Sequence, residues 1–188
     1  MRIPVSGGVP QFVLETRFCL YFRCARTPAN LCVIVEPSQG GKQLAITAFD
    51  PLKGRGKVLR TIEKDPSRDY GGTGLSPDGS TWAISLGGEP EIHIRLLSLS
   101  GGSDREITVQ GGPDVAGLDW SPDGKGLYCG SAAPQGRTLL YVDLKGNARV
   151  LGKYAAGGPL WGVPSPDGRY LAIGGAGSDS NVWVVEGF

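Results

Sequence analysis

The sequence predicts an all-β protein, a β-propeller made of four-stranded antiparallel blades. Its tetrapeptide Ser-Pro-Asp-Gly occurs three times, at intervals of 45 and 44 residues, and a repeat of this length is typical of one propeller blade. Apolar or aromatic residues precede each copy and alternating residues follow it, as expected for two paired strands. The 31 glycines and 14 prolines of the 188 residues indicate many tight turns. We therefore expect one propeller domain, or a propeller fragment, over residues 1–188.

Each tetrapeptide predicts a hairpin corner that joins two strands. Proline fixes φ at the second turn position, and glycine accepts the left-handed conformation at the fourth residue. Because the three carboxylates belong to separate blades, we expect them to shape turns rather than to form a catalytic cluster. The predicted structural turn residues are Ser76, Pro77, Asp78, Gly79, Ser121, Pro122, Asp123, Gly124, Ser165, Pro166, Asp167 and Gly168.

Counting from these corners divides the chain into blades. Residues 65–111 and 112–154 predict two full blades, and residues 17–64 predict a degenerate blade without the tetrapeptide. Residues 1–16 are expected to contain a stray outer strand, and residues 155–188 an incomplete blade with strands that include 170–174 and 181–185. Two arrangements remain open. Either the N-terminal strand completes the last blade and closes a ring, or the chain belongs to a larger propeller.

The repeats resemble the Pro-Asp repeats of TolB-like propellers, which are related to the Trp-Asp (WD40-like) repeat fold. Trp120 precedes one copy, and both Trp120 and Trp161 are expected to pack between blades. Residues 45–56, 138–151, 161–173 and 181–188 further resemble the C-terminal propeller of bacterial multidomain proteins. In those proteins a serine/threonine kinase or a winged-helix DNA-binding domain precedes the propeller. The resemblance implies a sensory or scaffold module of a bacterial signalling protein.

No catalytic pattern is found in the sequence. It lacks the kinase glycine-rich loop, the His-Arg-Asp and Asp-Phe-Gly motifs, and the Gly-x-Ser-x-Gly nucleophile elbow of serine hydrolases. The single histidine, His93, lies in an alternating segment and is expected to point away from its apolar face. We therefore expect no catalytic residue, no cofactor and no enzymatic activity. The alternative is a fragment of a kinase or peptidase whose catalytic domain lies outside this chain.

The four cysteines contain no CxxC pair, so no metal site is expected. Cys24 and Cys32 flank a seven-residue connection and either form a disulfide or remain as buried thiols. A disulfide predicts an extracytoplasmic location, and free thiols predict a cytoplasmic one. The N-terminus lacks a signal-peptide pattern, and no apolar segment is long enough to span a membrane. With 19 basic and 18 acidic residues, the chain predicts no nucleic-acid partner and no membrane insertion.

A protein or peptide partner is therefore the expected ligand class. The connections between second and third strands, and between blades, lie on the face opposite the tetrapeptides. Exposed charged and aromatic residues in such loops are candidates for binding. The candidate partner contacts are Arg68, Tyr70, Glu89, Asp114, Arg137 and Asp179.

Overall fold

The computed structural model describes residues 1–68, 70–87, 91–110, 115–131, 136–155 and 160–175. These residues form four antiparallel sheets in which consecutive strands are hydrogen-bonded neighbours. The first blade contains β1 (Tyr21–Cys24), β2 (Cys32–Ser38), β3 (Gln43–Asp50) and β4 (Gly54–Glu63). The second contains β5 (Tyr70–Leu75), β6 (Thr81–Leu86), β7 (Glu91–Ser98) and β8 (Arg105–Gln110). The third contains β9 (Val115–Trp120), β10 (Gly126–Ser131), β11 (Arg137–Asp143) and β12 (Ala148–Tyr154), and the fourth contains β13 (Leu160–Pro164) and β14 (Leu171–Gly175).

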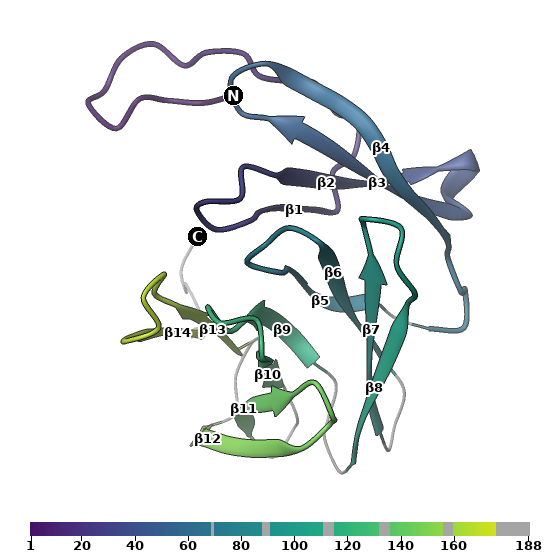
Figure 1. The fold of residues 1–188 in the computed structure, drawn as a ribbon, viewed down its shortest axis with the longest axis vertical. Helices are drawn as coiled ribbons and strands as arrows, with labels where there is room; N and C mark the ends of the chain where they lie inside the picture. Colours follow the sequence, from purple (N-terminus) through teal and green to yellow (C-terminus); the bar gives the residue numbers. More distant parts are fainter. Residues whose placement is uncertain (69, 88–90, 111–114, 132–135, 156–159, 176–188) are drawn as a thin grey trace, which may run out of the picture.

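The sheets are arranged as the blades of a propeller. Figure 1 shows β1, β5, β9 and β13 nearest the centre, with β4, β8 and β12 at the outside. A short 3₁₀ helix, η1 (Gln39–Gly41), joins β2 to β3. The predicted propeller fold is therefore confirmed.

Apolar side chains from adjacent sheets form the core. Trp82 of β6 is fully buried, and it packs with Val33 and Ile46 of the first blade. Between the second and third blades, Ile94 and Leu127 belong to a second cluster. The second blade contributes to both clusters, so both of its faces are buried, and β6 is buried from Trp82 to Leu86 without alternation.

Glycines allow the third and fourth blades to approach closely. A Cβ atom placed on Gly130 would overlap the main-chain oxygen of Leu160, and one placed on Gly117 would lie 2.5 Å from the same oxygen. At both positions the oxygen is too close for any side chain to fit. The strands β9 and β10 can therefore lie against β13 only because these positions lack side chains.

The N-terminal segment differs from its prediction. Residues 1–20 contain one isolated bridge, between Arg2 and Gln11, and no strand of a blade. Instead, the segment lies against the first blade, where Arg55 Nη2 donates to the main-chain oxygen of Glu15 at 3.0 Å. The expected outer strand in residues 1–16 is therefore wrong, and in the described structure it does not complete the last blade. The short segment between Pro4 and Pro10 turns back on itself instead, since proline cannot donate to a strand ladder.

The fourth blade is open on one side in the described residues. Trp161 and Val163 point to the same face of β13 and are 42% and 47% exposed. The prediction that Trp161 packs in the core is therefore wrong, whereas Trp120 is 4% exposed and confirms its prediction. The expected strand at residues 181–185 lies outside the described residues.

Candidate functional site

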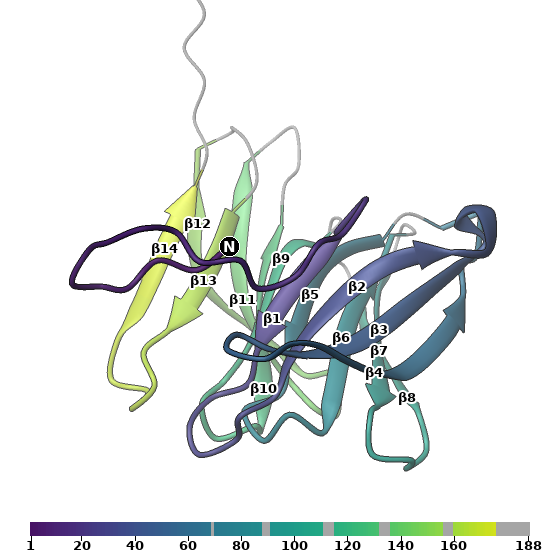
Figure 2. The same ribbon diagram turned by 90° about the horizontal axis from the view of Figure 1, so that it is seen from above.

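The three Ser-Pro-Asp-Gly corners share one hydrogen-bond pattern. In the second copy, Ser121 Oγ donates to Asp123 Oδ1 at 2.6 Å and accepts from the amide of Gly126 at 3.0 Å. The Asp123 carboxylate also accepts from the amide of Lys125. The first and third copies make the same bonds from Ser76 and Ser165. These corners lie at one end of the blades, as the β13–β14 corner at the lower end of Figure 2 shows.

The glycine that ends each copy adopts the left-handed conformation, with φ of 74°, 68° and 71° at Gly79, Gly124 and Gly168. The serine and aspartate side chains are occupied by the turn itself. In each corner the hydrogen bond from the serine lowers the pKa of the aspartate from its usual value. The geometry therefore supports the structural role that the sequence predicts.

Acid is expected to weaken these corners. Because the folded pKa of Asp123 lies below its unfolded value, the ionised carboxylate stabilises the fold above about pH 4, and this contribution is lost as the pH falls through the folded pKa. We expect Asp123→Asn to have a lower Tm than the wild type at pH 6. The difference should shrink at about pH 3, where the wild-type carboxyl is becoming protonated. A Tm difference that stays constant between the two pH values would contradict this prediction.

The equivalent corner of the first blade is built differently. Cys24 and Cys32 form a disulfide across the directly opposed ends of β1 and β2, so the bridge that the spacing permits is present. Between the two cysteines, Arg26 extends toward the corners of the other blades. In the first blade, the disulfide and the Arg26 side chain therefore take the place of the serine–aspartate turn.

Arg26 contacts all three remaining blades. Its amide donates to the main-chain oxygen of Pro77 at 3.1 Å, and its guanidinium donates to the main-chain oxygens of Ser165 at 3.2 Å and Trp120 at 3.5 Å. The guanidinium also lies 3.9 Å from the carboxylate of Asp119. Burial raises the pKa of the Asp119 carboxyl, and the charge of Arg26 opposes that rise. Arg26 therefore connects the blades at the corner end of the propeller.

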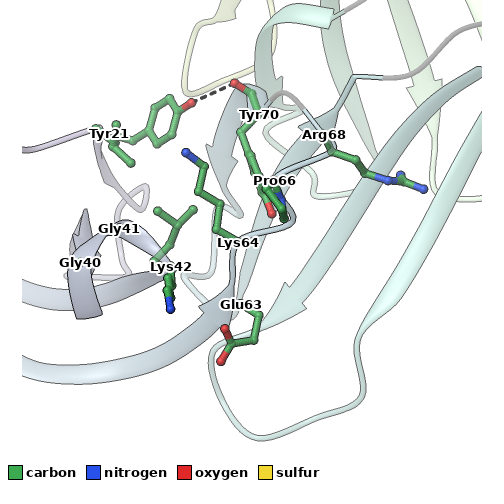
Figure 3. Close-up of a pocket in the computed structure, with 11 residues that line it drawn as sticks. Tyr21, Gly40, Gly41, Lys42, Glu63, Lys64, Pro66, Arg68 and Tyr70 are labelled. Atoms are coloured by element: carbon green, nitrogen blue, oxygen red, sulfur yellow. Dashed lines mark hydrogen bonds between the residues drawn. The ribbon is translucent and has the colours of Figure 1, made fainter.

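A large pocket in the described structure lies at the other end of the blades. Its volume is about 800 Å³, and it lies where the first blade meets the second (Figure 3). The start of β1, the β2–β3 connection, the end of β4 and the start of β5 supply its walls. The lining residues are Leu20, Tyr21, Gly40, Gly41, Lys42, Leu44, Glu63, Lys64, Pro66, Arg68 and Tyr70.

Hydrogen bonds between the two blades hold the aromatic part of this pocket in place. The Tyr21 hydroxyl donates to the main-chain oxygens of Tyr70 and Gly71, at 3.3 and 3.2 Å. The Tyr70 hydroxyl accepts from the amide of Asp65 at 2.9 Å. Burial raises the pKa of Tyr21, so its hydroxyl is protonated and can donate at neutral pH. Both rings are therefore fixed by the fold.

Two of the six predicted contact residues, Arg68 and Tyr70, come together in this pocket. Arg68 Nε lies 3.7 Å from the Asp65 carboxylate. Arg137 belongs to the third blade and is not among the lining residues; its Nε donates to the main-chain oxygen of Ala155. Glu89, Asp114 and Asp179 lie outside the described residues, so the binding role of all six remains a prediction.

Lys42 and Lys64 were not predicted as site residues from the sequence. They follow η1 and β4, and only the pairing of β3 with β4 brings them to one pocket. Arg26 was not predicted either, because its contacts are 51 to 139 residues away along the chain. His93 was placed correctly: it lies on the more accessible side of β7, with Nδ1 2.9 Å from the Glu106 carboxylate.

Within the described ranges, no group of three or more histidine, cysteine, aspartate or glutamate side chains could hold a metal ion. The same residues contain no helix that is long and apolar enough to cross a membrane.

Together, the repeated blades and the shared corners define a β-propeller. Solved structures of other proteins have a similar fold. The chain is similar to a TolB-like protein of Agrobacterium tumefaciens, with a TM-score of 0.62 and 19% identity over 89% of this chain and 59% of that one. It is also similar to a protein of unknown function from Desulfotomaculum acetoxidans, with a TM-score of 0.54 and 16% identity over 85% and 49% of the two chains. No family model and no curated protein sequence matches the chain.

The expectation that the chain is not an enzyme needs correction. A periplasmic gluconolactonase of Pseudomonas aeruginosa is among the similar structures, with a TM-score of 0.49 and 16% identity over 82% of this chain and 42% of that one. A missing catalytic motif does not by itself exclude activity, because function depends on a site rather than on the fold. At these identities the comparisons show the fold alone, and this chain spans about half the length of the solved structures that it matches.

Proposed function

We propose that this propeller binds a protein or peptide partner at the blade face that carries the Tyr21–Tyr70 pocket. The observation that supports the proposal is the pocket itself, about 800 Å³ in volume and lined by two fixed aromatic rings and several charged groups. Concave sites that combine apolar walls with a few polar groups are typical of binding sites. The corner end is less suited to this role, because its serine, aspartate and Arg26 groups bond to the protein itself.

The Cys24–Cys32 disulfide supports an extracytoplasmic location, since disulfides persist in oxidising compartments. Mass spectrometry of non-reduced peptides from protein isolated from its source organism should detect the two cysteines as one linked pair. Alkylated thiols at both positions would contradict this location.

We further propose that this chain is part of a bacterial signalling protein. The proposal is based on the sequence resemblance to propellers that follow a kinase or winged-helix domain. The alternative is a propeller that belongs to an enzyme with a separate catalytic domain. In that context too, the pocket would bind a protein or peptide. Sequence adjacent to residues 1–188 in the source genome distinguishes the two contexts.

Affinity capture with the folded 188-residue chain tests the binding role. We expect one identified protein to be retained by the wild type and lost with Arg68→Glu, which reverses a charge in the pocket. Lys145→Glu is the control, because this exposed residue lies in the β11–β12 turn at the corner end. Retention that is unaffected by Arg68→Glu, or equally reduced by Lys145→Glu, would exclude the pocket as the binding site.

A further inference from the structure

Two lysines lie directly opposite each other at the end of the β3–β4 pair. The register of these strands matches Gln43 with Glu63, and the next pair is Lys42 with Lys64. The amide of Lys64 donates to the main-chain oxygen of Lys42 at 2.9 Å. Like charges at opposed positions repel and destabilise a strand pair. Their pairing here concentrates positive charge at one edge of the pocket.

The nearby acidic side chains form no ion pair with either lysine in the described residues. Glu63 Oε1 accepts from Gln43 Nε2 at 2.5 Å, and the Asp65 carboxylate binds Ser67 and lies near Arg68. In the part of the chain that the structure describes, neither lysine ammonium has a carboxylate within ion-pair distance. Figure 3 shows Lys64 extending toward the Tyr21 ring, whereas Lys42 and Arg68 extend in other directions.

An apolar surface lies beside the lysines. The half-buried rings of Tyr21 and Tyr70 line the pocket, with the buried Leu44 behind them. Leu20, 37% exposed, continues this surface toward solvent. A matching ligand therefore carries both a negative charge and an apolar side chain.

We propose that the Lys42–Lys64 edge binds a carboxylate of an acidic segment of the partner, while a neighbouring apolar side chain of that segment packs against Tyr21 and Leu20. This inference rests on the proposed binding function and specifies the chemistry that the pocket recognises. Lysine ammonium groups act as flexible point charges and suit single carboxylates. Exposed charge pairs contribute modestly, so loss of both lysines is expected to weaken binding about tenfold.

NMR titration of the ¹⁵N-labelled chain tests the inference. The probe is an acetylated and amidated hexapeptide of alternating glutamate and leucine, and the neutral comparator replaces each glutamate with glutamine. We expect the acidic peptide to shift the amide signals of residues 40–44 and 63–70, with an affinity that falls as salt is added. The double variant Lys42→Gln/Lys64→Gln should bind about tenfold more weakly, with an otherwise unchanged amide spectrum.

Lys145→Gln/Lys153→Gln is the matched control, since it removes the same charge from exposed positions in the third blade. Equal weakening by this control would show that net charge, not the pocket, attracts the peptide, and would overturn the inference. Equal binding of the neutral peptide at the same residues would overturn the acidic specificity while leaving the proposed binding function intact. Shifts confined to other residues, or no shifts with either peptide, would overturn the inference, whereas the proposed binding function is overturned by the affinity capture with Arg68→Glu.

Discussion

Replacing Gly130 with valine is expected to lower the free energy of unfolding by about 3 kcal/mol or more. A Cβ atom at this position overlaps the main-chain oxygen of Leu160, which belongs to the inner strand of the fourth blade. Because the obstacle is backbone, no rotamer change relieves it, and β13 has to move away from β10. Urea denaturation followed by circular dichroism measures the loss.

Two other glycines separate this effect from the general cost of the substitution. Gly102→Val serves as the control, because its nearest neighbour is the Ser98 hydroxyl at 3.2 Å, a side chain that can move. Gly124→Val should cost about 1–3 kcal/mol, since φ of 68° strains valine but the nearest non-local atom is 4.0 Å away. Equal losses for Gly130→Val and Gly102→Val would show that the third and fourth blades are not packed as described.

Replacing Arg26 with methionine is expected to cost about 3 kcal/mol. Methionine retains most of the apolar stem but removes charged hydrogen bonds to the Ser165 and Trp120 oxygens, and it leaves the partly buried Asp119 without its closest cation. Since these contacts join separate blades, the variant should also exchange the amide hydrogens of β9 and β13 faster. Thermal unfolding and hydrogen exchange measure the two effects.

Arg17→Met is the control for this experiment, because Arg17 is an exposed arginine of the N-terminal segment. We expect it to change the free energy of unfolding by less than about 0.5 kcal/mol. If Arg26→Met matched this small change, the guanidinium would not be stabilising the contact between blades.

The sequence determined the blade pattern, because the residues that form each corner and its two strands are close together in the chain. The corner at Ser121 depends on residues within five positions, so its hydroxyl, carboxylate and glycine are found together in the chain. The strand predicted at residues 170–174 is observed as β14, Leu171–Gly175, for the same reason, since alternation and an adjacent turn are local signals. The Cys24–Cys32 bridge was identified as one of two alternatives from the short connection between its strands.

Only the tertiary structure decided how the blades meet. The exposure of Trp161, the position of residues 1–20 on the first blade, the reach of Arg26 and the joining of Lys42 with Lys64 all depend on strand pairing or on packing between distant segments. No local pattern encodes these contacts, because a charged residue after a strand looks the same whether it faces solvent or a neighbouring blade. Arg68 and Tyr70 illustrate the difference: their loop could be selected from the sequence, but the pocket around them exists only where the first and second blades come together.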